Sequence, residues 1–346
     1  MLNYRLQTLE ASEALIKDLY VDLRTKVNAW SEITQQTPQA RMGYVGQHLV
    51  SVVTGYPGGK SGARGYDLVM NNGGYGEIKT CYRVDQLGVC LNCKTVVSSL
   101  ETSCSACGST NIDRKDDSKW LISLRNETEF AEVIEPIKYY FVLFEFLDIY
   151  DSSNNDIKAT IWEVDSLNKG FAYCMVDYYL NIRASSKSKA PFNMWPYEFK
   201  FALTKPVLIY KSIIKTDGSI NTLVFPTMNN TYEDELKPLV DYARATTITI
   251  DSLQKVICRL MDGSITGYSK MEPLNLLEKF RVQMGSLTTS SSKRELLNLL
   301  EKFRVQNGIT NADLCDTFAE EIYLPLIIPK KSDIPTEIKS KFPELA

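Results

Sequence analysis

Histidine is almost absent from this sequence, because His48 is the only one among 346 residues. Mechanisms that combine a histidine base with histidine metal ligands, or that use Ser-His-Asp or Cys-His groups, therefore have at most one candidate. His48 lies in Gly46–Val50, which has the pattern of a helix, and we interpret it as an ordinary helix residue. Histidine-based catalysis is accordingly disfavoured.

A long hydrophobic run is also missing. The first 20 residues mix charged side chains through helical apolar spacing, which does not fit a secretory signal. The most apolar stretch, Tyr139–Leu147, is interrupted by Glu145 and is too short to cross a bilayer. The composition is that of an ordinary globular protein, so disordered and fibrous classes are excluded. We expect a cytoplasmic protein without a membrane partner.

A large excess of one charge sign is absent as well. The formal net charge of -3 argues against a protein that coats nucleic acid non-specifically. Basic residues nevertheless gather between residues 181 and 215, among aromatic residues that include Phe192, Trp195, Tyr197 and Phe199, and with Glu198 as the only acidic residue. These basic residues are Arg183, Lys187, Lys189, Lys200, Lys205, Lys211 and Lys215. Two interpretations stay open: a face that binds DNA phosphates, or a solvated surface on which lysines cluster.

Apolar spacing predicts helices through residues 1–55, and a glycine-rich basic loop with Lys60 and Arg64 follows at residues 56–65. A helix is expected at Phe171–Ile182, and helical spacing returns from about residue 233. Strands are expected at Tyr66–Met70, Tyr75–Tyr82, Trp120–Leu124, Tyr139–Ile149, Ile157–Val164, Tyr197–Ala202 and Val207–Ile214. The fold class is therefore mixed α/β. We predict a core over residues 1–232, with a cysteine-rich insertion at 86–112, and a mainly helical region over 233–346.

One ten-residue sequence, LNLLEKFRVQ, occurs twice, at Leu274–Gln283 and at Leu297–Gln306. Both copies have the spacing of amphipathic helices, and a Ser/Thr-rich stretch at residues 286–292 separates them. Two copies are too few for a solenoid. A local duplication that yields two packing helices is favoured over a dedicated device for reading DNA or a partner.

The segment from Asp67 to Lys79 has the pattern of a hairpin that carries two carboxylates. Asn71–Gly74 is a turn sequence between the two expected strands. Side chains alternate along a strand, so Glu77 and Lys79 share one face while Ile78 points into the core. Asp67 lies across the turn from Glu77, and the two carboxylates together suit a hard cation such as Mg²⁺. A positioned divalent cation is what phosphodiester hydrolysis requires.

This hairpin resembles the active-site motif of the PD-(D/E)XK nuclease superfamily, in particular that of type II restriction endonucleases. The residues that carry the resemblance are Asp67 and, after nine intervening residues, Glu77-Ile78-Lys79. The motif usually has a proline where this chain has Tyr66. The resemblance implies a restriction-endonuclease-like core with a mixed central sheet flanked by helices. It also implies catalysis by Asp67, Glu77 and Lys79, and Mg²⁺ held by Asp67, Glu77 and the backbone carbonyl of Ile78. Gln47, on the preceding helix, is expected to support the site.

Three other Glu-x-Lys triplets begin at Glu198, Glu235 and Glu337. Glu198 lacks a partner aspartate on a hairpin, Glu235 lies in a charged helix start, and Glu337 follows Pro335 near the end of the chain. Only Glu77 combines a strand, a turn and an upstream aspartate. The alternative for the hairpin itself is a surface hairpin whose charged residues form an ion pair.

Two CxxC sequences, Cys90–Cys93 and Cys104–Cys107, are separated by ten residues. This spacing is typical of a zinc ribbon or a related four-thiolate site. A redox CxxC occurs once beside a βαβ unit, and a disulfide pair fits a secreted chain, so structural Zn²⁺ is the favoured interpretation. The remaining cysteines are interpreted as ordinary thiols: Cys81, Cys174, Cys258 and Cys315.

The leading hypothesis is a type II restriction endonuclease that cuts double-stranded DNA as a homodimer, because two strands need two active sites. The alternatives are a repair or junction-resolving nuclease of the same superfamily and a non-catalytic zinc-ribbon protein. The zinc module is expected to hold the loop at residues 83–86, or its own tip at 94–101, against DNA. The predicted DNA-contacting residues are Lys60, Arg64, Arg83, Gln86, Arg183, Lys187 and Lys189.

Overall fold

The computed structural model describes residues 4–36, 43–59, 67–99, 101–183, 186, 190–228, 236–264, 282 and 292–346. Its contacts divide the chain into two compact units. The sheet unit comprises Met1–Leu121, Pro136–Val164 and Val207–Glu233. The helical unit comprises Ile122–Glu135, Asp165–Pro206 and Asp234–Ala346. The predicted α/β class is confirmed.

The last crossing of the chain between the two units lies between Glu233 and Asp234, and the division predicted at residue 232 stays a prediction. The two earlier segments of the helical unit, 122–135 and 165–206, had been assigned to the core from sequence alone. Their membership depends on contacts with helices far along the chain, which local patterns do not reveal. The extent of an independently folding core therefore stays a prediction.

Within its described residues, the sheet unit contains three α-helices, a π-helical segment and a 3₁₀ turn. These are α1 (Leu9–Ile16), η1 (Lys17–Asp22), α2 (Leu23–Thr34), α3 (Gly43–Thr54) and η2 (Arg83–Asp85). Its strands are β1 (Leu68–Val69), β2 (Tyr75–Tyr82), β3 (Gly88–Cys90), β4 (Val96–Val97), β5 (Ile112–Asp113), β7 (Lys138–Phe146), β8 (Ile157–Asp165), β10 (Val207–Ile214) and β11 (Ile220–Val224). A short strand, β6 (Trp120–Ile122), lies at the border of the two units.

Six strands form the main sheet in the order β1-β2-β7-β8-β10-β11. β1 and β2 are antiparallel, β2 and β7 are parallel, and β10 is antiparallel to both β8 and β11. The sheet is therefore mixed. The parallel pair needs a long connection between its strands, and in this chain that connection contains the cysteine-rich segment. The strands of the cysteine-rich segment form a separate sheet in the order β4-β3-β5.

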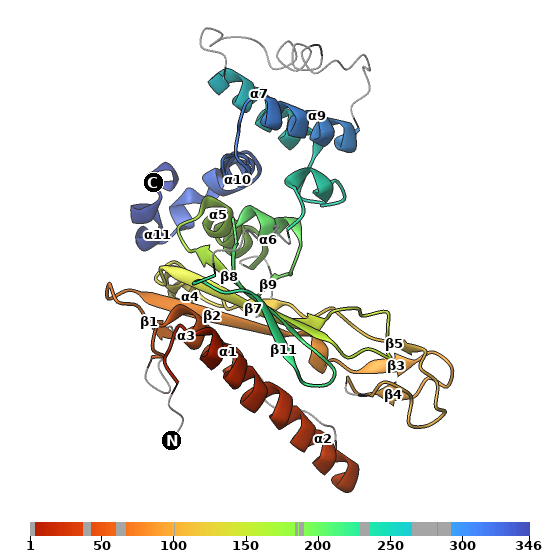
Figure 1. Ribbon diagram of the computed structural model, residues 1–346. Helices are drawn as coiled ribbons and strands as arrows, with labels where there is room; N and C mark the ends of the chain where they lie inside the picture. Colours follow the sequence, from red (N-terminus) through yellow and green to blue (C-terminus); the bar gives the residue numbers. More distant parts are fainter. Residues whose placement is uncertain are drawn as a thin grey trace. The chain divides into compact units, whose positions relative to one another are not determined.

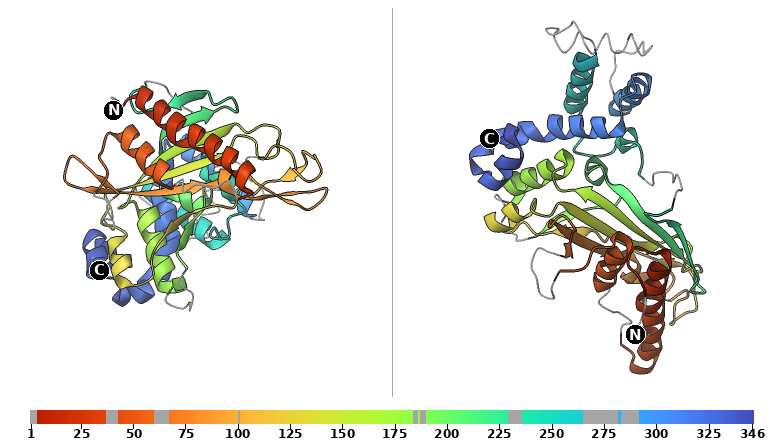
Figure 2. Two further views of the ribbon diagram at one scale, coloured as in Figure 1. Left: turned by 90° about the horizontal axis from the view of Figure 1, so that it is seen from below. Right: turned by 60° about the vertical axis from the view of Figure 1, so that its left-hand side comes forward.

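One hydrophobic core fills the space between the main sheet and the N-terminal helices. Alternate residues of β7, from Tyr140 to Phe146, lie in it together with Leu49 and Val53 of α3 and Ile16 of α1. Figures 1 and 2 show α1 and α3 against the same face of the sheet, with α2 continuing beyond it. Helix α3 lies very close to β2 at Gly46. A Cβ atom on Gly46 would lie only 2.2 Å from the Thr80 hydroxyl oxygen. Only glycine allows α3 to approach so closely.

The helical unit is built around α10 (Asn311–Ile327), which packs against α5 (Lys169–Asp177), α6 (Phe199–Leu203) and α7 (Ile250–Ser264). Its other elements are α4 (Glu127–Glu132), η3 (Tyr178–Arg183), β9 (Phe192–Met194), η4 (Leu239–Tyr242), α9 (Lys293–Gln306), η5 (Ile328–Asp333), α11 (Thr336–Lys341) and η6 (Pro343–Leu345). The second copy of LNLLEKFRVQ lies in α9 and buries Leu297, Leu300 and Phe303. The first copy, apart from Val282, lies outside the described residues.

The strand predicted at Tyr197–Ala202 is wrong, because this segment contains the start of helix α6. Tyr197 has a φ of 61°, a left-handed conformation that ends an extended chain. The next residues bury Phe199, Ala202 and Leu203 at helical spacing. A short apolar run cannot be assigned to strand or helix by periodicity alone.

Among the helices that the structure describes, none combines the length and the apolar character needed to cross a membrane.

Candidate active site

The hairpin predicted at residues 67–79 is present, and its turn is fixed by the backbone. The Met70 amide donates to the Gly74 carbonyl at 2.9 Å, and Gly73 adopts a φ of 78°. β1 and β2 pair so that Leu68 lies opposite Gly76. One residue further along this register, Asp67 lies opposite Glu77. The two carboxylates that the sequence analysis selected therefore come from neighbouring positions on adjacent chain segments.

Asp67 is held on both sides by other parts of the sheet unit. Its Oδ1 accepts a hydrogen bond from Gln47 Nε2 at 2.9 Å, and its Oδ2 accepts one from the Ile78 amide at 2.8 Å. The Gly59 amide donates to the Asp67 carbonyl at 3.1 Å. The structure thus brings Gln47 of α3 to the residue that it was predicted to support.

The side chains of β2 alternate between its two faces, so Glu77 and Lys79 lie on the face opposite the core residue Ile78. Ile78 is only 6% exposed and belongs to the core beneath α3. Glu77 and Lys79 share one face, where Lys79 Nζ forms an ion pair with Glu77 Oε1. Their side chains are 16% and 24% exposed, so both are partly shielded and still accessible to solvent. The ion pair expected for an ordinary surface hairpin is therefore present, but the carboxylate of Asp67 lies beside it.

The electrostatics of the hairpin favour a cation. Burial, together with the nearby Glu77 carboxylate, raises the pKa of Asp67, while the Ile78 amide and the Lys79 ammonium oppose that shift. Two carboxylates that repel one another are suited to a divalent ion, which would relieve the repulsion. Each oxygen of Asp67 accepts one hydrogen bond and keeps a further lone pair. The donor set therefore fits Mg²⁺.

The four-cysteine segment contains two knuckles with the same hydrogen bonds. In the first, the Cys90 amide donates to the Thr95 carbonyl and the Lys94 amide donates to the Cys90 carbonyl, both at 2.9 Å. In the second, the Cys104 amide donates to the Ser109 carbonyl at 2.8 Å, and the Gly108 amide donates to the Cys104 carbonyl at 2.7 Å. The residue after each second cysteine is left-handed, with φ of 62° at Lys94 and 71° at Gly108. Each CxxC is therefore folded as a tight turn that can aim both thiols at one point.

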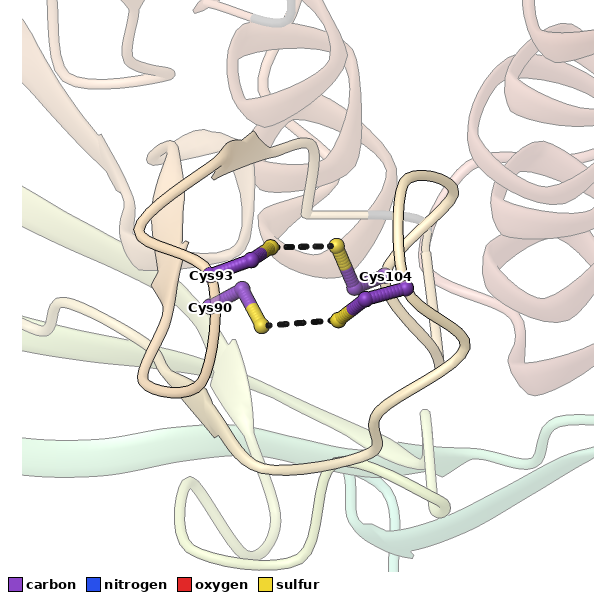
Figure 3. Close-up of side chains that lie close together, drawn as sticks. Cys90, Cys93 and Cys104 are labelled. Atoms are coloured by element: carbon purple, nitrogen blue, oxygen red, sulfur yellow. Dashed lines mark hydrogen bonds between the residues drawn. The ribbon is translucent and has the colours of Figure 1, made fainter.

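The four thiols converge. The Sγ atoms of Cys90 and Cys107 are 3.6 Å apart, and those of Cys93 and Cys104 are 3.5 Å apart (Figure 3). All four lie within 4.8 Å of one another, and among the described residues no other group of three or more His, Cys, Asp or Glu side chains does so. Disulfides need about 2.05 Å, whereas zinc bonds of about 2.3 Å separate tetrahedral sulfurs by roughly 3.8 Å. The cluster fits zinc.

Hydrogen bonds with the hydroxyl and backbone of Thr95 lower the pKa of Cys93 to about 6. A thiolate is the form in which cysteine binds a metal, so this contact favours ligation.

The four-cysteine module is attached to the rest of the sheet unit at two places. Arg24 of α2 forms an ion pair with Asp85, at the entry to the module. On the other side, Arg114 donates to the Ser152 carbonyl at 3.1 Å and to Asn155 Oδ1 at 2.7 Å. The Arg114 guanidinium also lies 4.1 Å from the ring centre of Phe146. The module is thus fastened beside the ends of β2 and β7.

Arg83, a predicted DNA-contacting residue, belongs to a charge network that the sequence analysis missed. Its Nη1 lies 3.3 Å from Glu145 Oε2 and 3.9 Å from Asp116 Oδ2. Lys158 Nζ lies 2.9 Å from the other oxygen of Glu145. These residues line a cavity of about 230 Å³. The partners are far apart in sequence, so no local pattern signals the network, and contact of Arg83 with DNA stays a prediction.

Two further candidates also contact protein groups. Gln86 donates to the Ser118 hydroxyl, and Arg183 donates to the carbonyls of Ser186 and Arg125 at 3.2 and 2.9 Å. Their contact with DNA is likewise still a prediction. The remaining candidates lie outside the described residues: Lys60, Arg64, Lys187 and Lys189.

The described residues of the basic stretch 181–215 belong to both units. Lys211 is buried on β10, and Lys215 pairs with Asp156 at 2.9 Å within the sheet unit. In the helical unit, Lys205 pairs with Asp316 at 2.8 Å. The clustering in sequence is therefore divided between the two units.

Comparison with known proteins gives one match. No curated protein and no solved structure matches the chain. Residues 29–241, which include the hairpin and the four-cysteine module, match the family model described as MamI restriction endonuclease. Because this match covers well over half of the 346 residues, the protein belongs to the MamI restriction endonuclease family.

Proposed function

We propose that this restriction endonuclease is a Mg²⁺-dependent type II enzyme of the PD-(D/E)XK superfamily, which hydrolyses phosphodiester bonds of double-stranded DNA in a sequence-specific manner. The observation that carries the proposal is the joint placement of Asp67, Glu77 and Lys79, with Gln47 bonded to Asp67. The family supplies DNA as the substrate. The hairpin supplies the groups for the reaction.

The proposed metal ligands are the carboxylates of Asp67 and Glu77 and the backbone carbonyl of Ile78. When bound there, Mg²⁺ would neutralise the scissile phosphate and lower the pKa of a water. The protein's own part is positioning. Gln47 and the Ile78 amide keep the two oxygens of Asp67 in place, so little reorganisation is needed at the moment of reaction.

Lys79 is proposed to act on the phosphate side. Its ammonium is paired with Glu77, and it can exchange that partner for an oxygen that gains negative charge during cleavage. Nζ carries three donors and no acceptor. It therefore stabilises developing negative charge or orients the attacking water through hydrogen bonds, and it keeps its own proton.

Structural Zn²⁺ is proposed at Cys90, Cys93, Cys104 and Cys107. A four-thiolate site is closed to substrate, so its part is to organise the chain. The module follows β2 directly and is proposed to hold residues 83–86 or 94–101 against DNA. The enzyme is proposed to work as a homodimer, so that two active sites cut two strands.

A plasmid or phage DNA substrate tests the function. Purified protein is incubated with Mg²⁺ beside its Glu77→Ala variant, and light scattering reports the oligomer. Discrete fragments from the wild type alone are the expected result. A smear of fragments would indicate a repair-type or non-specific nuclease and would contradict sequence-specific cleavage. Equal inactivity of both proteins would indicate a DNA-binding protein without catalysis.

A further inference from the structure

The helical unit contains a hollow of about 440 Å³ that the proposed active site does not use. Its walls come from two chain segments, one at residues 197–200 and the other between Lys237 and Thr247. The family match ends at residue 241, so the second wall extends past it. The hollow is therefore partly made by a region that the family model does not describe.

Three cations line this hollow: Lys200, Lys237 and Arg244. Within the described part of the chain, none of them forms an ion pair, whereas Lys205 and Arg259 of the same unit do. Glu198 and Asp241 also line the hollow, but neither pairs with a described cation. The positive charge of the three side chains is thus not cancelled by direct contact.

The wall that carries Lys200 lies between two residues with left-handed backbone conformations. Tyr197, just before α6, has a φ of 61°, and Lys205, just after it, has a φ of 50°; neither is glycine. Such conformations persist where the surroundings impose them, and they concentrate at functional sites. Phe199, between them, is buried, with its ring centre 5.8 Å from Tyr242 and 5.7 Å from Phe318. The cation is therefore presented from a fixed support.

Unpaired cations beside aromatic side chains are the features that bind a nucleic-acid strand, through its phosphates and through the faces of its bases. Lys200 Nζ lies 5.7 Å from the ring centre of Phe192, and Tyr197 and Tyr242 add aromatic surface to the hollow. We propose that this hollow binds backbone phosphates of the DNA substrate through Lys200, Lys237 and Arg244. The proposal rests on the proposed function only in taking DNA as the ligand.

Equilibrium binding to a fluorescent duplex tests the proposal, with Ca²⁺ in place of Mg²⁺ so that affinity is measured without cleavage. The variant Lys200→Gln/Lys237→Gln/Arg244→Gln removes the three charges. Each phosphate contact contributes about 0.9 to the slope of log affinity against log salt concentration. The slope is therefore expected to fall by about 2 to 3, and affinity should fall for cognate and unrelated sequences alike.

A matched control carries the same change in net charge at exposed or partly exposed lysines elsewhere in the helical unit, Lys255→Gln/Lys339→Gln/Lys341→Gln. It is expected to keep the wild-type slope. A second variant, Lys200→Arg/Lys237→Arg/Arg244→Lys, keeps the charges and should also keep the slope, which separates lost charge from lost folding. A wild-type slope in the glutamine variant, or an equal loss in the control, would overturn the proposal.

Inorganic phosphate and a mononucleotide form a further arm. If either raises the melting temperature of the wild type but not of the glutamine variant, while the DNA slope is unchanged, the hollow binds a small phosphate ligand and the proposal is wrong. The cleavage assay with Glu77→Ala is independent of these results. Failure at the hollow with cleavage intact leaves the proposed function standing, and a failed active-site assignment leaves the binding test valid.

Discussion

The hairpin proposed as the active site and the four-cysteine module proposed to bind zinc are neighbours in the chain, yet their donor atoms are held in opposite ways. In the module, four thiols from two matching knuckles converge on one point. In the hairpin, Asp67 is held by Gln47 and the Ile78 amide, and Glu77 is paired with Lys79. The thiols form a complete ligand set, whereas the two carboxylates do not.

This difference separates structural from catalytic work. A four-thiolate zinc has no position for substrate, but two carboxylates leave most of the shell of Mg²⁺ to water and phosphate oxygens. Changes in the hairpin should therefore act on the cleavage rate with little effect on stability. Changes in the module should act first on stability. A hairpin variant that lost stability, or a module variant that lost only cleavage rate, would contradict this separation of roles.

The largest effect is expected for Glu77→Ala. Loss of a metal-binding carboxylate should lower the single-turnover cleavage rate by ~10³-fold or more, equivalent to ~4 kcal/mol of activation free energy. The melting temperature should change little, because Glu77 lies outside the hydrophobic core and its side chain keeps contact with solvent. Glu337→Ala, in the matching triplet of α11, is the control and should cut normally. A Glu77→Ala enzyme within tenfold of wild type would remove the hairpin from the reaction.

Cys93→Ser tests the other side of the comparison. The variant should lose its zinc and melt about 10 °C lower, because structural zinc sites contribute directly to folding. DNA affinity should fall with it if the module holds residues 83–86 or 94–101 in place. Metal analysis and calorimetry measure the change, with Cys258→Ser as the control that keeps zinc. A zinc-free variant with normal stability and specific binding would contradict the assignment.

Lys79→Gln should lower the cleavage rate by ~10²-fold while DNA affinity in Ca²⁺ stays near the wild-type value, because the ammonium acts on charge that develops during cleavage. It should also change the pH profile. Lys79 opposes the raised pKa of Asp67, so its loss raises that pKa further, and activity should be lost at a higher pH as the solution is acidified. Lys339→Gln is the matched control. Equal losses in affinity and rate would mean that Lys79 only binds DNA.

Local chemistry made the hairpin and both knuckles predictable from the sequence. A turn at Asn71–Gly74 and alternation along Tyr75–Tyr82 place Glu77 and Lys79 on one face, and CxxC spacing needs no tertiary information. The ion pair of Arg83 with Glu145 and the membership of residues 122–135 and 165–206 in the helical unit were not predictable, because both depend on contacts between residues far apart in the chain. Helix α6 was mistaken for a strand because the left-handed Tyr197 has no sequence signal.

The smallest effect is expected for Gln47→Ala. Gln47 is not a proposed metal ligand itself, but it holds Asp67, which is one. Its amide donates to Asp67 Oδ1 at 2.9 Å, and a hydrogen bond to the charged form favours that form. The variant should therefore cut ~10-fold more slowly at neutral pH and recover partly as the pH rises, because Asp67 must be ionised to hold the cation.

The same substitution has a defined sign in stability. The folded pKa of Asp67 is raised above its usual value, so in metal-free protein the neutral carboxyl contributes stability at low pH that is lost as pH rises through the folded pKa. Gln47→Ala raises that pKa further, so the loss should become larger and extend to higher pH, whereas Asp67→Asn should remove it. Melting curves against pH without metal measure both. If Gln47→Ala left the pH profiles of rate and stability unchanged, Gln47 would be an ordinary helix residue, and the carboxylates would be positioned by the hairpin alone.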